Sequence, residues 1–202
     1  MSVRPASLIS HPYGKPALAA LLLLPFAYLV FGVTMNRLGP NPAEALIRSS
    51  GDWTLRMLCL TLAVTPARVL SGWHALARYR RMVGLFTAFY ALIHALSYLM
   101  FDMEFVWAAV GADLVKRPFI AVGMLAFTLL AVLAGTSTTS AVRLLGAMRW
   151  QRLHRAVYGI AGLALLHFFW MRSGKQDFAE VAVYALVLGT LLGWRAVRFK
   201  RK

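Results

Sequence analysis

Six apolar stretches, each close to the ~20 residues that a helix needs to cross a bilayer core, follow one another along this 202-residue chain. Backbone polar groups inside a bilayer are satisfied only within helices or closed barrels. Hydrophobic residues make up 60% of the chain and charged residues only 14%, too few polar side chains to cover a soluble domain of this size. The sequence therefore predicts an all-α, polytopic membrane protein with a six-helix transmembrane bundle. The expected spans are residues 17–35, 53–70, 82–101, 118–135, 154–171 and 178–194.

Lys and Arg are divided unevenly between the two ends of these spans. With the N-terminus placed in the cytoplasm, 15 of the 22 Lys and Arg residues fall in cytoplasmic segments, and all seven acidic residues fall on the other side or at its helix ends. Because Lys and Arg collect in cytoplasmic loops, both termini are expected to be cytoplasmic. This topology, together with contact to membrane lipid, accounts for the net charge of +15, so we expect no nucleic-acid partner.

Three histidines, His94, His154 and His167, lie inside apolar segments, where an ionisable side chain is costly and usually faces a partner, a cavity or a cofactor. The third and fifth spans share one direction across the membrane. His94 lies about 18 Å along its helix from Met82, and His167 about 20 Å from His154. Two imidazoles at matching depth in parallel helices can bind a haem iron from both sides, which favours electron transfer over oxygen binding.

Other roles for these histidines remain open at this stage. Each imidazole can instead bond a Ser, a Thr or a backbone carbonyl across helices. His154 lies near the cytoplasmic boundary, about 140° around the helix from His167. It is a candidate ligand of a second haem, or a contact for a propionate, a flavin or a quinone. His74 is a conceivable partner for it, although a loop histidine is usually solvated.

Arginines gather at the cytoplasmic end of the same two spans. Haem propionates, flavin phosphates and anionic lipid are all recognised by arginine, and a basic rim that sets orientation has the same composition. The cluster contains Arg78, Arg80, Arg81, Arg149, Arg152 and Arg155. On the other side, segments 36–53 and 102–117 are the loops long enough to contact a partner protein. Their acidic residues Asp102, Glu104 and Asp113 are expected to be solvated charges rather than a steering patch.

Several short motifs give the chain a family resemblance. They are TPAR at 65–68, RRMVGL at 80–85 leading to His94, KRPF at 116–119, TST at 136–138 and RWQRLHRAVY at 149–158, followed by His167 and Trp170. Over residues 21–198 the chain resembles the MsrQ family, the haem-binding membrane subunits of the bacterial periplasmic protein-methionine-sulfoxide reductase system. More broadly it is similar to the ferric-reductase-like transmembrane domain that NADPH oxidases share.

The resemblance implies a function and a set of cofactors. Such proteins lie in the cell inner membrane and bind b-type haem (heme b), with flavin mononucleotide (FMN) as a further cofactor. They take electrons from the quinone pool or a cytosolic flavin reductase. They deliver them to a periplasmic, molybdopterin-containing catalytic subunit that repairs oxidised methionines in envelope proteins. His94, His154 and His167 carry over as haem-ligand candidates. The chain would then be an electron-transfer subunit rather than the catalytic subunit of the oxidoreductase system.

The resemblance also suggests how the chain is divided. The expected layout is a cytoplasmic N-terminal segment at 1–16, a ferric-reductase-like haem-binding domain at 17–196 and a basic cytoplasmic tail at 197–202. The larger oxidases carry two histidines in each of two helices, whereas the third span here carries one. That difference puts a second bis-histidine haem in question.

Two other functions fit the same residues. A stand-alone haem-dependent ferric or transmembrane reductase would turn over without a partner protein. A haem-free transporter or assembly factor would use its histidines to relay protons or brace helices, and would purify without haem absorbance.

Overall fold

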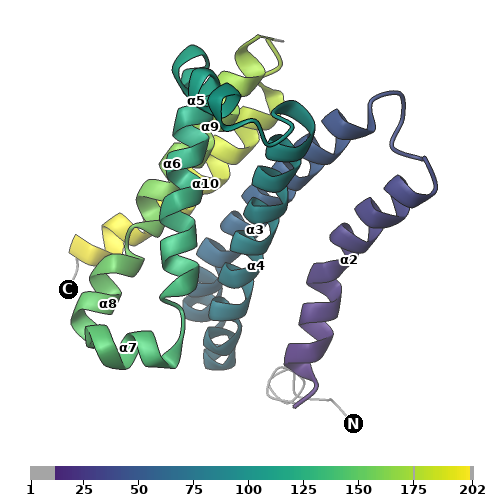
Figure 1. Cartoon of the computed structure of the whole chain (residues 1–202). Helices are drawn as coiled ribbons and strands as arrows, with labels where there is room; N and C mark the ends of the chain where they lie inside the picture. The colour runs from purple at the N-terminus through teal and green to yellow at the C-terminus, as the bar shows by residue number, and fades with distance from the viewer. Residues whose placement is uncertain (1–11, 175, 201–202) are drawn as a thin grey trace. The chain divides into compact units, whose positions relative to one another are not determined.

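A computed structural model describes residues 12–174 and 176–200 of the chain, and every regular element among them is a helix (Figure 1). Residues 1–11, Lys175 and residues 201–202 lie outside the described residues. These include most of the expected N-terminal segment 1–16 and the last two residues of the expected tail. The elements are α2 (Gly14–Thr34), α3 (Pro42–Ser71), η1 (His74–Tyr79), α4 (Arg80–Ser97), η2 (Tyr98–Asp102), α5 (Trp107–Lys116), α6 (Pro118–Gly135), α7 (Thr139–Leu145), α8 (Ala147–His154), α9 (Val157–Ser173) and α10 (Ala179–Lys200). The all-α prediction is confirmed for this part of the chain.

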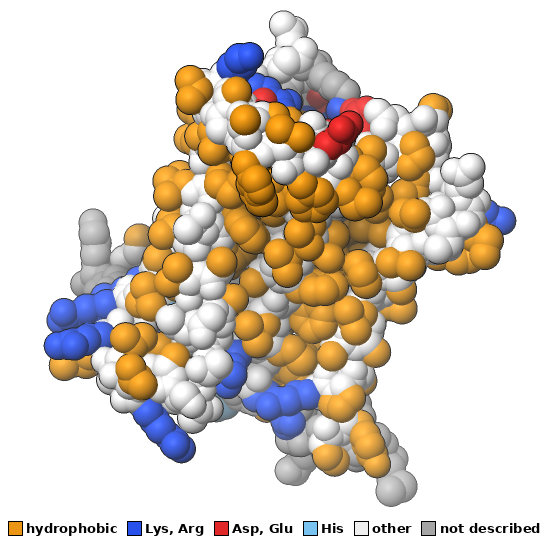
Figure 2. Space-filling model, viewed as in Figure 1, with side chains coloured by type: hydrophobic (Ala, Val, Ile, Leu, Met, Phe, Trp, Pro, Cys, Tyr) orange, Lys and Arg blue, Asp and Glu red, His pale blue; other side chains and the backbone are white. Residues whose placement is uncertain are grey.

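Five stretches in the described residues are long and apolar enough to cross a membrane. They are α2, α3, the continuous run His74–Asp102, α6 and α10. The 17 residues of α9 would extend about 26 Å, slightly less than a bilayer core of about 30 Å. In Figure 2 hydrophobic side chains cover the visible sides of the helices, while Lys and Arg gather where Figure 1 draws α7 and α8. The chain is thus a membrane protein with several apolar helices.

Two segments expected to be outer loops contain helices. Most of 36–53 belongs to α3, which begins at Pro42 because the Asn41 side chain accepts a hydrogen bond from the Glu44 N–H at 3.1 Å and proline suits the first helical position. Segment 102–117 contains α5. The second span is therefore longer at its start than its apolar residues alone indicate, and less irregular chain remains for contact with a partner.

His154 does not lie in the same helix as His167, contrary to the expected span 154–171. It is the last residue of α8, and α9 begins three residues later at Val157. The sequence offers no proline or glycine at this junction, so periodicity alone could not reveal the break. The angle of about 140° between the two histidines assumed one continuous helix and does not apply.

The chain divides into two compact units, Met1–Ser97 and Tyr98–Lys202. In the first unit α3 and α4 run side by side (Figure 1) and share a core with α2. That core includes Leu22, Met57, Val83 and the fully buried Tyr90. The Tyr90 hydroxyl donates to the Leu22 carbonyl at 2.7 Å and accepts from the Phe26 N–H at 3.2 Å. Tyr90 thus satisfies backbone groups of α2 beside the helix-interior Pro25.

In the second unit α6 packs against α9, and α9 against α10. A polar corner joins η2, α5 and the start of α6. The Tyr98 hydroxyl donates to Asp113 at 2.7 Å, and the Arg117 guanidinium donates to both oxygens of the same carboxylate. Arg117 comes directly before α6, so this corner fixes where α6 begins.

Candidate functional site

His94 points from α4 towards the backbone of α3. Its Nδ1 lies 2.8 Å from the carbonyl oxygen of Ile47. A carbonyl oxygen only accepts hydrogen bonds, so Nδ1 carries the proton. In the neutral ring this places the lone pair on Nε2, the nitrogen that binds a metal.

His167 has the same arrangement in the second unit. Its Nδ1 lies 2.6 Å from the carbonyl oxygen of Phe119 on α6. Nδ1 is again the donor, and the lone pair of the neutral ring again resides on Nε2. The Phe119 side chain also lies against the imidazole, with ring centroids 6.0 Å apart.

A glycine lies against each imidazole ring. Gly51 comes four residues after Ile47, and Gly123 four residues after Phe119, the residues whose carbonyls accept the hydrogen bonds. A Cβ built on Gly51 would lie 3.1 Å from Cε1 of His94, and one built on Gly123 would lie 2.7 Å from Nδ1 of His167. Each histidine therefore contacts the bare backbone of the neighbouring helix. The sequence shows no internal repeat, yet both units contain this arrangement of carbonyl, glycine and histidine.

The environment of each of these two histidines, taken within its own unit, fits a ligand of haem iron. Histidines that bind metals almost always donate their other ring N–H to a carbonyl, a carboxylate or water, which fixes the ring and raises its basicity. The described residues contain no group of three or more His, Cys, Asp or Glu side chains that could hold a bare metal ion. Haem needs no such group, because the porphyrin supplies the equatorial nitrogens and the protein supplies only axial ligands.

His154 has a different environment. Its Nε2 lies 3.1 Å from the Thr136 hydroxyl oxygen at the end of α6. Its ring stacks on the Trp150 indole with centroids 3.9 Å apart, and that indole N–H donates to the Thr136 carbonyl at 2.8 Å. His154 is thus held against the end of α6. To bind iron, its Nε2 would have to give up the hydrogen bond to the Thr136 hydroxyl. Thr136 belongs to the TST motif, and Trp150 and His154 belong to the RWQRLH motif. Nothing in the sequence indicates that these two motifs contact each other.

The remaining candidates divide between exposed and partly buried positions. His74 is exposed at the first position of η1, as expected for a solvated histidine. Arg78 is partly buried beside the Tyr79 ring, with its guanidinium carbon 5.4 Å from the ring centroid. The exposed arginines of the basic cluster are Arg80, Arg81, Arg149, Arg152 and Arg155.

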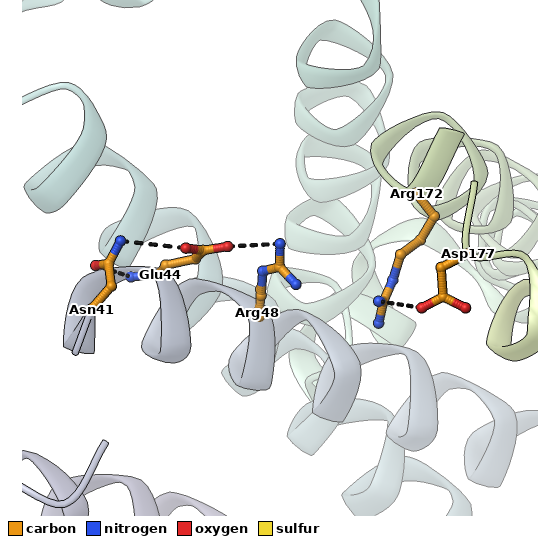
Figure 3. Close-up of polar contacts among 5 residues, drawn as sticks. All are labelled: Asn41, Glu44, Arg48, Arg172 and Asp177. Atoms are coloured by element: carbon orange, nitrogen blue, oxygen red, sulfur yellow. Dashed lines mark hydrogen bonds and ion pairs between the residues drawn. The ribbon is translucent and has the colours of Figure 1, made fainter. Parts of the chain in front are cut away.

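Four of the seven acidic residues, Glu44, Asp113, Asp177 and Glu180, are paired with arginines. Figure 3 shows Glu44 between Asn41 and Arg48 in α3 and, within the second unit, Arg172 with Asp177. Asp113 was expected to be solvated, but its side chain is only 13% exposed and is paired with Arg117. The Arg117 hydrogen bonds, with help from Tyr98, lower the pKa of this carboxyl.

Comparisons with known proteins agree with the resemblance seen in the motifs. The profile of the family described as "ferric reductase like transmembrane component" matches residues 17–165. A protein-methionine-sulfoxide reductase heme-binding subunit MsrQ of Polaromonas naphthalenivorans is 57% identical over 185 residues, covering 92% of this chain and 84% of that protein. Proteins of the same name from Ralstonia nicotianae and Bordetella pertussis are 50% and 48% identical, covering 88% and 93% of this chain and 85% and 91% of their own lengths.

Proposed function

The chain belongs to the MsrQ family of ferric-reductase-like transmembrane proteins, and from this premise we propose that it carries electrons through b-type haem across the bacterial inner membrane. It is the haem-binding membrane subunit of a protein-methionine-sulfoxide reductase system. The observation that supports haem binding most directly, and through it electron transfer, is that Nδ1 of both His94 and His167 bonds a backbone carbonyl and leaves Nε2 to bind iron.

We propose that His94 and His167 would hold the haem iron, each through Nε2. Their pairing on one iron rests on their matching depth in the sequence. Ile47 and Phe119 hold the two rings through their carbonyls, so neither imidazole has to reorient when iron binds. When bound between His94 and His167, b-type haem would supply a one-electron carrier, and two histidine ligands would favour electron transfer over oxygen binding.

The donor, the acceptor and the further cofactor come from the family. We propose that electrons enter from the quinone pool or a cytosolic flavin reductase. They leave to a periplasmic, molybdopterin-containing catalytic subunit, which does the methionine-sulfoxide chemistry. FMN is proposed as an additional carrier. The described elements are nearly all apolar or short helices, and we propose that nucleotide oxidation and sulfoxide reduction take place on the partner proteins.

We also propose the full topology. Six crossings with both termini in the cytoplasm require α9 to span the membrane despite its 17 residues. Local thinning of the bilayer accommodates a short helix at modest cost. The distribution of Lys and Arg supports the orientation, with the exposed arginines of α8 on the cytoplasmic side.

We keep His154 as the candidate ligand of a second haem, which it reaches by exchanging the Thr136 hydroxyl. The stacked Trp150 would then hold the ring as it does in the structure. The expected consequence is that His154→Ala lowers the number of haems per chain by one. An unchanged number would show that His154 braces α6 and binds no iron.

The experiment that tests the function is visible spectroscopy of the protein purified in mild detergent. We expect a sharp α band on dithionite reduction, and in both His94→Ala and His167→Ala the loss of the absorbance that belongs to the haem held by these two residues. Thermal unfolding of the variants by circular dichroism controls for misfolding. A wild-type protein that remains colourless when haem is supplied during expression would refute the proposal and favour the haem-free transporter.

The partner is tested separately, with the reduced wild-type protein and a candidate catalytic subunit. We expect reoxidation only when that subunit and a protein-bound methionine sulfoxide are both present. Rapid reoxidation by ferric citrate alone, at a rate the catalytic subunit does not exceed, would favour the stand-alone reductase.

A further inference from the structure

Gly51 and Gly123 are the described glycines where an added Cβ would meet a histidine ring. For ten of the other described glycines, among them Gly135, Gly159 and Gly162, no heavy atom lies within 4 Å of the added carbon. At Gly84 the added carbon would make only an ordinary contact, 3.6 Å from the Thr61 methyl. Gly32 also has a close neighbour, but the atom that its added Cβ would meet, at 2.5 Å, is Cδ2 at the end of the flexible Leu38 side chain. The two close approaches to a histidine ring therefore occur at the two candidate haem ligands.

Helix geometry explains why a glycine is needed at this spacing. In an α-helix the carbonyl of residue i points along the axis towards the N–H of residue i+4. Residue i+4 also lies above residue i on the same face. An imidazole that donates to the carbonyl of residue i must therefore pass over the Cα of residue i+4. Ile47 with Gly51, and Phe119 with Gly123, have this spacing.

We propose that Gly51 and Gly123 are positioning residues that hold the two haem-ligating histidines in their metal-binding tautomer and orientation. This inference rests on the proposed haem ligation by His94 and His167. Each glycine leaves room for the ring to reach the carbonyl, and the resulting bond keeps the proton on Nδ1. A side chain at either position displaces the ring, which weakens that bond and the basicity of Nε2.

The two positions differ in how much room they leave, so the effects are graded. The Cβ of an alanine at position 123 would lie 2.7 Å from Nδ1 and 2.8 Å from Cε1 of His167, closer than carbon atoms approach without displacement. At position 51 the corresponding distances to His94 are 3.2 Å and 3.1 Å, which a small shift of the ring relieves. Gly123→Ala is thus expected to perturb haem binding more than Gly51→Ala does.

The test compares haem-loaded wild type with Gly123→Ala, Gly51→Ala and the controls Gly162→Ala and Gly84→Ala. Gly162 lies on the same helix as His167, and Gly84 on the same helix as His94. The rate of haem transfer to excess apomyoglobin and the haem midpoint potential are measured for each. Loss of a bond that orients a metal ligand typically weakens metal binding by roughly 10- to 100-fold.

We expect haem transfer at least about tenfold faster in Gly123→Ala, a smaller acceleration in Gly51→Ala, and wild-type rates in both controls. The midpoint potential should rise in the same order, because a less basic imidazole stabilises ferric iron less. If Gly123→Ala does not fold, Gly51→Ala carries the test. A haem-loaded wild type whose glycine variants all match the controls would overturn this inference alone, whereas a haem-free wild type would overturn the proposed function itself.

Discussion

Replacing Asp113 with alanine should loosen the corner at which α6 begins. The substitution removes the acceptor of the Tyr98 hydroxyl and of the Arg117 guanidinium. The Tyr98 residue is only 6% exposed, and leaving its O–H unsatisfied costs about 1–3 kcal/mol. Arg117 is 39% exposed at its side chain, so solvent limits its contribution to about 0.5 kcal/mol. The helix propensity of alanine offsets about 0.5 kcal/mol, which leaves a destabilisation of about 2 kcal/mol.

The assay is thermal unfolding in detergent, followed by circular dichroism and by the haem absorbance. A loss of about 2 kcal/mol corresponds to a midpoint lower by about 4–8 °C for a domain of this size. Haem should also dissociate faster, because Phe119, whose carbonyl holds His167, lies two residues beyond Arg117. Glu44→Ala is the matched control. It breaks an ion pair whose partners are 34% and 49% exposed, and such pairs contribute less than about 1 kcal/mol. Equal midpoints for the two variants would refute the assignment of a structural role to this corner.

The same carboxylate predicts a pH dependence. The pKa of Asp113 is lowered in the folded protein, so its contribution to stability is fully present above the ordinary aspartate pKa of about 3.9. That contribution is lost as the pH falls through the lowered value. The difference in midpoint between wild type and Asp113→Ala should therefore be constant at neutral pH and shrink below about pH 4. A difference that grows on acidification would contradict the sign of the shift.

Three further substitutions test single contacts. Tyr90→Phe removes a hydroxyl that bonds a backbone donor and a backbone acceptor of α2. It should lower the free energy of unfolding by about 1–2 kcal/mol, measured by thermal unfolding. The control Tyr28→Phe, at a position that is 71% exposed, should leave the free energy of unfolding unchanged. Thr136→Val removes the hydroxyl that bonds His154. It should lower stability by about 1 kcal/mol and leave the spectrum of the haem that His94 and His167 would hold unchanged. Gly72→Ala should lower the free energy of unfolding by about 1 kcal/mol, because the φ of Gly72 is 72°, in the left-handed region. The added carbon itself has room, since nothing lies within 4 Å of it. An unchanged unfolding midpoint would show that the end of α3 adopts another backbone conformation in the variant.

The sequence predicts helices well where apolar runs coincide with end signals. The fourth expected span, 118–135, agrees with α6 because Pro118 occupies the first turn and the apolar run stops at Gly135. The start of α3 was missed by 11 residues, since Glu44, Arg48 and Asp52 make that stretch polar although Asn41 and Pro42 signal a helix start. Hydropathy locates the part of a helix that lipid covers, whereas capping residues locate the helix itself.

The candidate site could be predicted only in part, for a reason that lies in the chemistry of its contacts. His94 and His167 are conspicuous because imidazoles are rare in apolar segments. Their partners are backbone carbonyls, which every residue carries, and two of the 15 glycines in the chain. Neither kind of group stands out in one sequence. The recurrence of this arrangement therefore becomes visible only when helix packing shows which carbonyl and which glycine face each ring, and the glycine variants test it at the two positions where an added carbon would meet an imidazole.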